Sequence, residues 1–387
     1  MDNFDLNKVV EKIMDRIQKE FKEMDTLNVM VLGKTGVGKS TLINNMFNER
    51  MADTGIGKPV TKEIKKITKP DFPLAIYDTP GIELGGEKDL ASLLDGIKAE
   101  VSKGVKSGDI EQAIHCIWYC ISTPSHRFEE AEIKFLKELF DRTVEGEVPV
   151  IIVLTKSYSK VDAEKMMSEI EKENLPIAKI VPVLAEDYDI DEEYVAKAYG
   201  LDVLSEVMNN AVPEAVKKTF VAVQKANLEL KKKRAHAVVA ATALTAAATG
   251  AAPIPFSDAA LLVPEQISML AGITAVFGFP VEKGTFSAIL SSTIGTAGAT
   301  VLGRTIASNL IKFVPGVGSV VGGIISASTA SALTIALGET YIKIMEKVYE
   351  GELKVSDLST KKGKKSMKAM FVKELKVKRE KDKEVSE

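Results

Sequence analysis

Hydrophobic residues in the first half of the chain fall in short runs that alternate between strand and helix periodicity. Apolar runs of strand length stand at 27–32, 64–68, 74–77, 113–121, 148–154 and 178–184, with helical stripes at 129–140 and 162–174. The run 148–154 is nearly all apolar, as expected for a strand of a parallel sheet that helices cover on both faces. The alternation predicts an α/β domain over residues 26–210, built on a doubly wound, mostly parallel sheet.

Two helices and a basic tail are predicted outside this domain. In residues 1–25, apolar positions follow helical spacing with charges between them, which predicts an amphipathic helix. Such a helix either packs on the domain that follows or serves self-association or a membrane surface. Residues 212–234 predict a charged helix that leads into the next part of the chain. The lysine-rich residues 351–387 are expected to be flexible.

An almost uncharged block separates the charged linking helix from the basic tail. Between Ala235 and Gly338 only six residues are charged, and the long uncharged runs are 237–257, 284–303 and 313–338. These runs reach the roughly 20 residues that span a bilayer, and nearby basic residues suit anionic head groups. They are also rich in Ala, Gly, Ser and Thr and lack aromatic belts, which suits the buried helices of a soluble bundle. We expect a helical domain over 211–350, with both alternatives open.

Composition and charge exclude several classes of protein. With 45% hydrophobic and 27% charged residues over 387 positions, the chain is neither disordered nor fibrous. Lys+Arg 51 against Asp+Glu 54 gives a net charge of −3, so no global basic field indicates nucleic acid. Cys116 and Cys120 lie in an apolar run and are typical of reduced core residues. Since the polar N-terminus does not resemble a secretory signal, we expect a cytoplasmic protein, alone or at the inner face of a membrane.

A glycine-rich loop between the first predicted strand and a helix carries the strongest chemical signal. Its residues are Gly33, Lys34, Thr35, Gly36, Val37, Gly38, Lys39 and Ser40, which fit G-x-x-x-x-G-K-[ST]. In this pattern backbone N–H groups surround phosphate oxygens, assisted by the positive potential of the helix N-terminus. Lys39 is then expected to reach the β- and γ-phosphates, and the Ser40 hydroxyl to ligate Mg²⁺. Thr41, the next residue of the helix, is counted with the nucleotide-binding residues.

A second motif, Asp78-Thr79-Pro80-Gly81, directly follows the apolar run 74–77. A carboxylate at the end of a strand beside the phosphate loop can hold the hydration shell of Mg²⁺, and we assign this role to Asp78. Gly81 can turn its backbone N–H toward the γ-phosphate. The pattern D-x-x-G gains its meaning from its position about forty residues after the phosphate loop.

Together these motifs resemble the TRAFAC-type P-loop GTPases, and most closely the Era-like, septin-like and immunity-related branches, over residues 27–185. The resemblance implies a protein that binds GTP and GDP with Mg²⁺ and hydrolyses GTP to GDP. It also implies a catalytic and metal-binding role for Thr61, which lies between the two motifs, with Thr54 as the runner-up. Lys39 and Gly81 complete the implied catalytic set.

The base-reading motif departs from the family pattern. The family has [NT]-K-x-D, whereas this chain has Thr155-Lys156-Ser157-Tyr158. The resemblance assigns Thr155 and Lys156 to nucleotide binding, and Ala185 to the loop that meets the guanine carbonyl. Tyr158 lacks the carboxylate that grips guanine, and Asp162 replaces it only if the loop folds back. Guanine selectivity is therefore implied by the family alone, and ATP binding stays an alternative.

Hydrolysis is expected to differ from that of Ras-type proteins. They place a water-orienting Gln directly after D-x-x-G, whereas this chain has Ile82. We expect slow intrinsic hydrolysis, accelerated by a homodimer across the nucleotide face. Residues 235–345 resemble the YcjF-type C-terminal domain of unknown function of bacterial GTPases. The favoured function is a GTPase that switches this helical effector or membrane-associating domain, and the alternative is a nucleotide-dependent oligomerising scaffold with little turnover.

Overall fold

The computed structural model places the chain in two compact units. Its described residues are 6–52, 64–79, 87–125, 128–142, 148–191, 193–250, 262–278 and 327–353, with single positions at 360, 365, 369, 370 and 373. One unit is Lys22–Leu228, and the other combines Met1–Phe21 with Glu229–Glu387. Each unit buries hydrophobic residues of its own.

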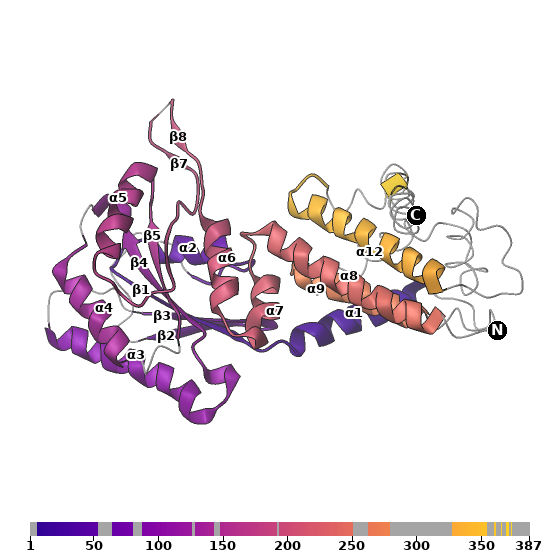
Figure 1. Ribbon diagram of the computed structural model, residues 1–387, viewed down its shortest axis with the longest axis horizontal. Helices are drawn as coiled ribbons and strands as arrows, with labels where there is room; N and C mark the ends of the chain where they lie inside the picture. Colours follow the sequence, from indigo (N-terminus) through magenta and orange to yellow (C-terminus); the bar gives the residue numbers. More distant parts are fainter. Residues whose placement is uncertain are drawn as a thin grey trace, which may run out of the picture. The chain divides into compact units, whose positions relative to one another are not determined.

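A six-stranded sheet forms the centre of the first unit, in the order β2-β3-β1-β4-β5-β6 (Figure 1). The strands are β1 (Leu27–Gly33), β2 (Lys65–Lys69), β3 (Phe72–Asp78), β4 (Cys116–Ser122), β5 (Val150–Thr155) and β6 (Lys179–Pro182). Only the pairing of β2 with β3 is antiparallel, and the other four pairings are parallel. The predicted doubly wound, mostly parallel sheet is confirmed.

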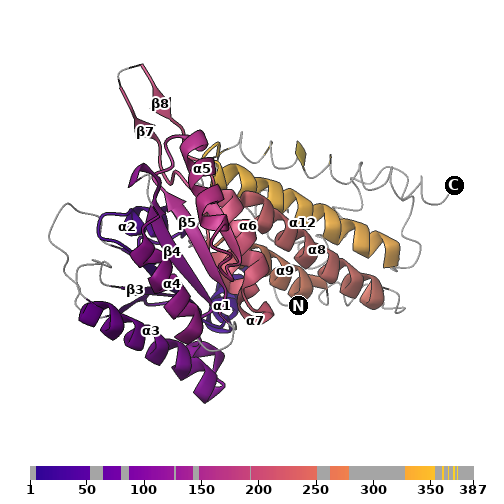
Figure 2. The same ribbon diagram turned by 60° about the vertical axis from the view of Figure 1, so that its left-hand side comes forward.

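Helices cover this sheet on both faces. They are α2 (Lys39–Met46), α3 (Glu87–Ser107), α4 (Glu130–Arg142), α5 (Lys160–Glu171), α6 (Leu201–Ala211) and α7 (Glu214–Val223), with 3-10 turns at Ile110–Gln112 and Thr123–Ser125. Helices α3 and α4 lie on one face, and α6 and α7 on the other (Figures 1 and 2). Helix α3 was not predicted from the sequence, although Leu94, Ile97 and Val101 have helical spacing and are buried.

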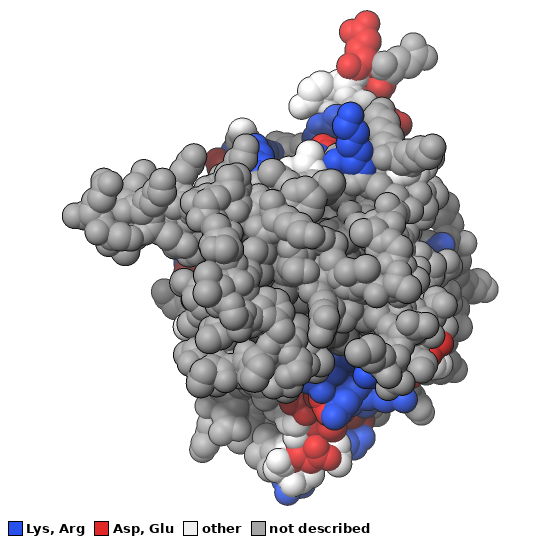
Figure 3. Space-filling view, turned by 90° about the vertical axis from the view of Figure 1, so that its right-hand side faces the viewer, with Lys and Arg blue, Asp and Glu red and all other residues white. Residues whose placement is uncertain are grey.

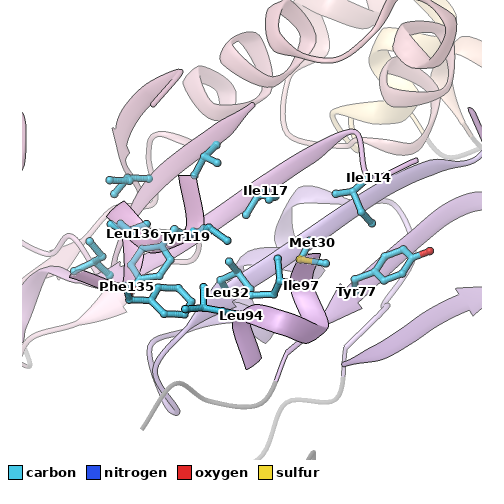
Figure 4. Close-up of a cluster of buried hydrophobic side chains, with 14 of the residues drawn as sticks. Met30, Leu32, Tyr77, Leu94, Ile97, Ile114, Ile117, Tyr119, Phe135 and Leu136 are labelled. Atoms are coloured by element: carbon cyan, nitrogen blue, oxygen red, sulfur yellow. The ribbon is translucent and has the colours of Figure 1, made fainter. Parts of the chain in front are cut away.

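The main core lies between the sheet and the α3–α4 face. In Figure 4, Met30 and Leu32 of β1 face Leu94 and Ile97 of α3. Further buried members are Tyr77, Ile114, Ile117, Tyr119, Phe135 and Leu136. Fully burying one such side chain contributes about 1.5–3 kcal/mol, so this layer holds the sheet against its helices.

The acidic segment after β6 forms an exposed hairpin. Its strands are β7 (Tyr188–Asp189) and β8 (Val195–Ala196), which pair in antiparallel fashion. Both views show the hairpin extending away from the sheet beyond α5 (Figures 1 and 2). Among the described residues, no group of three or more His, Cys, Asp or Glu side chains is placed to hold a metal ion.

The charged helix predicted over 212–234 is broken in two, and the reason is Gln224. Its buried side chain accepts hydrogen bonds from the backbone N–H groups of Ala226 and Asn227, both at 2.8 Å, and donates to the Asn227 carbonyl at 2.9 Å. These bonds stabilise a turn between α7 and the next helix. Because α7 contacts β1 and β3, residues 211–228 belong with the sheet and not with the predicted helical domain 211–350.

The second unit is helical. Its described helices are α1 (Leu6–Lys22), α8 (Leu228–Gly250), α9 (Leu262–Phe277) and α12 (Ala327–Tyr349). Helices α8 and α12 approach each other closely at Gly338, because a Cβ at this position would come within 2.4 Å of the Val239 side chain. The hydroxyl groups of Thr274 and Tyr341 bond to each other at 2.7 Å inside the unit. Within the described part of the chain, no helix combines the length and the apolar character that a bilayer crossing needs. The predicted run 284–303 lies outside the described residues.

Helix α1 groups with the C-terminal helices, and not with the domain that follows it in sequence. Its buried side chains include Val10, Ile13 and Ile17, which form the apolar stripe of the predicted amphipathic helix. An apolar stripe predicts that one face of the helix is buried, but it does not show which part of the chain covers that face. The grouping of α1 with the C-terminal helices is therefore visible only in the tertiary structure.

Lys231 of α8 is fully buried, which is rare for a lysine side chain. Its ammonium group donates to the carbonyls of Val276 at 3.0 Å and Phe277 at 3.1 Å, at the C-terminal end of α9. A cation at that end of a helix satisfies carbonyls that have no partner inside the helix. Burial lowers the pKa of Lys231 well below its ordinary value.

Charges of both signs share the surface of this unit. Lys232 pairs with Glu229 at 3.0 Å and with Glu346 at 2.9 Å, and His236 bonds to Glu339 at 2.9 Å. In Figure 3, described basic and acidic side chains lie beside each other at the upper and lower margins of the view.

Two glycines of α3 give a matched test of the packing. A Cβ at Gly104 would lie 2.3 Å from the Ala113 Cα, whereas a Cβ at Gly96 would make an ordinary 3.5 Å contact with Ile64. Gly104→Ala is expected to destabilise the protein by about 2 kcal/mol through overpacking. Gly96→Ala should stabilise it by about 0.5–1 kcal/mol, because alanine favours helix. Urea unfolding followed by the fluorescence of Trp118 measures both, and equal effects of the two substitutions would contradict the packing.

Candidate nucleotide-binding site

The glycine-rich loop lies where β1 ends and α2 begins. Gly33 has φ 141°, and a Cβ there would lie 2.5 Å from the Cys120 carbonyl of β4. Only glycine allows this approach, so the loop can start inside the sheet and turn tightly out of it. Gly38 precedes the first residue of α2 in the left-handed conformation, with φ 104°. The backbone amides of the loop thus gather at the N-terminus of a helix, an arrangement that suits phosphate oxygens.

Lys39 bends back over this loop. Its ammonium group donates to the Gly33 carbonyl at 2.9 Å and to the Lys34 carbonyl at 3.2 Å. Burial lowers the pKa of Lys39, and the carboxylate of Asp78 acts in the opposite direction. The cation is therefore held in a partly desolvated place, where its attraction to an anion is stronger than in water.

Asp78 ends β3 at the same edge of the sheet, opposite Val31 of β1. Burial raises the pKa of this carboxyl, while Lys39 and Lys65 lower it. The next residue is fixed as well, since the Thr79 hydroxyl donates to the Val31 carbonyl at 3.1 Å. A carboxylate at this edge and the hydroxyl of Ser40 at the start of α2 are hard oxygen donors, which fits Mg²⁺.

Several predicted site residues lie outside the described part of the chain. These are Thr54, Thr61, Gly81 and Ile82. Their predicted roles in metal binding and hydrolysis stay predictions.

The loop after β5 is fastened directly to the phosphate loop. The Thr155 hydroxyl lies 2.6 Å from the Val37 carbonyl and 3.1 Å from the Ile121 carbonyl. The ammonium group of Lys156 donates to the Gly36 carbonyl at 2.7 Å, and its backbone is left-handed, with φ 53°. Thr155 and Lys156 therefore brace the loop, and their contacts to a nucleotide stay predictions.

The loop that carries Ala185 adjoins the loop after β5. The backbone N–H of Ser157 donates to the Val183 carbonyl at 3.2 Å, which holds the two loops together. Asp162 does not fold back toward them, because its backbone N–H bonds to the Ser159 hydroxyl at 3.2 Å in the first turn of α5. Instead, the ring of Tyr158 lies 4.2 Å from the ring of Tyr188, measured between centroids.

The structure adds an ion-pair group that the sequence did not reveal. The ammonium group of Lys34 lies 3.1 Å from the Glu129 carboxylate and 3.4 Å from that of Glu132. Glu132 is only 3% exposed, and burial raises its pKa while Lys34 lowers it. This group joins the phosphate loop to α4. Nothing in the local sequence distinguishes Glu132 from the exposed acidic residues around it.

The part of the chain that carries the phosphate loop is similar to known GTPases. Residues 28–156 match the family model described as 50S ribosome-binding GTPase. This stretch, about a third of the chain, is similar to the P-loop GTPase domain that the model describes, and septins and Era are among the similar proteins.

Individual relatives are distant. Septin-1 of Drosophila melanogaster is 26% identical over 223 residues, which cover 51% of this chain and 58% of the relative. Cell division control protein 11 of Saccharomyces cerevisiae is 26% identical, covering 48% and 50%. GTPase Era of Pseudomonas fluorescens is 27% identical, covering 48% and 55%. The chain thus spans about half the length of these relatives.

Solved structures show a similar picture. A crystal structure of Era in complex with MgGDPNP and a 16S ribosomal RNA fragment has TM-score 0.35 and 20% identity, covering 50% of this chain and 58% of the other. Toc33 of Arabidopsis thaliana with Mg²⁺ and GMPPNP has TM-score 0.32 and 20% identity, covering 54% and 91%. The YcjF-type resemblance of residues 235–345 stays a prediction.

The partly buried carboxyl of Asp78 gives a prediction with a defined sign. Its pKa in the fold lies above the ordinary value of 3.8, so stability falls as pH rises through that raised pKa. Asp78→Asn removes this loss and should raise the melting temperature at about pH 7 without nucleotide. The gain should vanish at pH values below 3.8, where the carboxyl is protonated in both states.

Asp187→Asn is the matched control for this pH series. Lys197 and the backbone N–H of Ala198 lower the pKa of Asp187, so its carboxylate stabilises above pH 3.8, and this contribution is lost as pH falls. Asp187→Asn should therefore give no gain near pH 7. A gain of equal size in both variants would show that burial of Asp78 is not its source.

Proposed function

We propose that this chain binds GTP and GDP with Mg²⁺ and hydrolyses GTP to GDP. The observation that carries the proposal is the convergence of Lys39, Ser40 and Asp78 at one edge of the sheet, around a loop of backbone amides. A cation, a hydroxyl and a carboxylate beside such a loop fit a triphosphate and its metal ion.

Each residue of the proposed site has a separate task. The amides of residues 33–40 surround the phosphates, and Lys39 neutralises the β- and γ-phosphate oxygens. Ser40 and Asp78 hold Mg²⁺, together with Thr61 as implied by the family resemblance. When bound, the metal neutralises charge that develops on the phosphate oxygens. Thr41 adjoins the phosphates, and Gly81 directs a backbone N–H toward the γ-phosphate.

Removal of the Lys39 ammonium group tests nucleotide binding. Lys39→Ala should weaken binding of a fluorescent GTP analogue by about 100-fold, because a partly buried charge contact to phosphate is lost. Lys69→Ala is the control, because Lys69 lies at the end of β2, outside the phosphate loop. Its ammonium group pairs with the Glu49 carboxylate at 2.9 Å, and its side chain is 36% exposed. The control should bind as the unchanged protein does. Undiminished binding by Lys39→Ala would refute the proposal.

Hydrolysis is proposed to be slow for a single copy of the chain. The residue after Gly81 is Ile82, which has no group that can orient a water molecule. We infer that a second copy, associating across the nucleotide face, accelerates the reaction.

Single-turnover hydrolysis over a range of protein concentrations tests this association. The rate constant should rise with concentration and reach a plateau when the dimer is saturated. A matched series with Lys39→Ala gives the background. A rate constant independent of concentration would leave the chain a monomeric GTPase.

The proposed effector is the helical unit. Helix α8 begins at Leu228, where the GTPase unit ends, so the chain connects them without a long linker. We expect bound GTP to order segments near the γ-phosphate and hydrolysis to release them, and this change would alter the helical unit. Membrane contact through residues 235–350 and the basic tail stays a prediction.

A further inference from the structure

Two tyrosines lie together at the side of the phosphate loop that faces β5 and β6. Tyr158 is two residues after Lys156, whose ammonium group is bonded to Gly36, and its backbone N–H donates to the Lys156 carbonyl at 2.8 Å. Thr155 holds the same loop against Val37. The position of Tyr158 relative to the phosphate loop is therefore fixed by short, direct hydrogen bonds.

The second tyrosine comes from the hairpin. The rings of Tyr158 and Tyr188 are 4.2 Å apart between centroids, with 37° between their planes. Tyr188 is 46% exposed, so a broad part of the aromatic surface faces solvent. The pair joins the loop after β5 to β7, and the two tyrosines lie thirty positions apart in sequence.

The base of the hairpin is rigidly built. Leu184 and Tyr199 exchange two backbone hydrogen bonds, at 3.0 and 2.9 Å. The Asp187 carboxylate accepts hydrogen bonds from the Ala198 N–H and the Lys197 ammonium group, each at 2.8 Å. These four bonds link the two sides of the hairpin on which Tyr188 lies.

The order of the strands indicates on which side of the phosphate loop the base of a bound nucleotide would lie. In open α/β sheets a ligand lies in the crevice outside the carboxyl ends of the strands. In the order β2-β3-β1-β4-β5-β6, Asp78 of β3 lies on one side of the phosphate loop, and β5 and β6 lie on the other. A nucleotide with its phosphates on residues 33–40 and its metal beside Asp78 would therefore extend its sugar and base toward the loops after β5 and β6. Those loops carry Lys156, Tyr158 and Tyr188.

A phenol discriminates between purines less than a carboxylate does. A carboxylate accepts both edge N–H groups of guanine, whereas a neutral phenol offers one O–H donor and one oxygen acceptor. Burial, followed by Tyr188 and Glu186, raises the pKa of Tyr158, so its hydroxyl stays neutral. Stacking on an aromatic ring does not discriminate strongly between bases, because every base has a flat face.

We propose that Tyr158 and Tyr188 form the base-contacting surface of the nucleotide site. The pair makes it a purine site with only a weak preference for guanine over adenine. The inference rests on the proposed nucleotide binding and goes beyond it, because it makes the hairpin a part of the site and assigns Tyr188 a direct contact with the base.

Competition of GTP and ATP for a fluorescent nucleotide, in Mg²⁺, tests the inference on the full chain. The unchanged protein should bind the two within about tenfold of each other, as expected without a carboxylate. Tyr158→Asp should raise the preference for GTP by at least about tenfold, because the new carboxylate accepts from guanine and not from adenine. Tyr188→Ala should weaken both nucleotides by about tenfold through the loss of stacking, and Tyr188→Phe should retain both.

Tyr194→Ala is the matched control, since Tyr194 lies on the same hairpin and is 60% exposed. It should leave both affinities unchanged, and circular dichroism checks that every variant folds. A preference for GTP above about 1000-fold in the unchanged protein, or full affinity in Tyr188→Ala, overturns the inference while nucleotide binding stands. Failure of the unchanged protein to bind either nucleotide overturns the proposed function as well.

Discussion

The close contact of Gly33 with the carbonyl of Cys120 is the constraint on which the proposed nucleotide site depends. A Cβ at position 33 would lie 2.5 Å from that oxygen, so the chain leaves β1 against the backbone of β4. This exit directs the loop along the carboxyl edge of the sheet, where α2 begins and where the Thr155 hydroxyl meets the Val37 carbonyl at 2.6 Å. The loop is thus held at its start by sterics and at its middle by a buried hydrogen bond. A phosphate site made of backbone amides needs this rigidity, since amides that must reorganise bind weakly.

The charged forms of Lys39 and Asp78 in this proposed site reduce the stability of the fold. Burial lowers the pKa of Lys39 and raises the pKa of Asp78, so both ionised forms are disfavoured by their surroundings. Each group attracts the other, but burial is the larger effect for both. Groups perturbed in opposite directions by burial, at one edge of a sheet, are typical of functional sites. A bound phosphate and metal ion would supply the opposite charges that the fold itself leaves incomplete.

The sequence was sufficient wherever the information is local. The strand β1, the loop after it and the strand end at Asp78 follow from periodicity and motif, and the mostly parallel sheet follows from their alternation. The turn made by Gln224, the buried Lys231 and the pairing of α1 were not predicted. Each depends on a partner that the sequence does not name, such as the Val276 carbonyl, which lies 45 residues from Lys231. A charged or polar residue in a helix is normally solvated, so only the tertiary structure reveals these exceptions.

The two ends of the proposed nucleotide site follow different physical rules. Phosphates are recognised by backbone amides, whose placement depends on glycines and hydrogen bonds and hardly on other side chains. In the proposed site the base is recognised by side chains on the loops after β5 and β6, and these can change without disturbing the sheet. Replacement of a carboxylate by Tyr158 is compatible with the fold because Thr155 and Lys156 still brace the loop, at 2.6 and 2.7 Å. Tyr188 then provides a second aromatic face from a separate hairpin, so selectivity for the base depends on elements that the phosphate loop does not constrain.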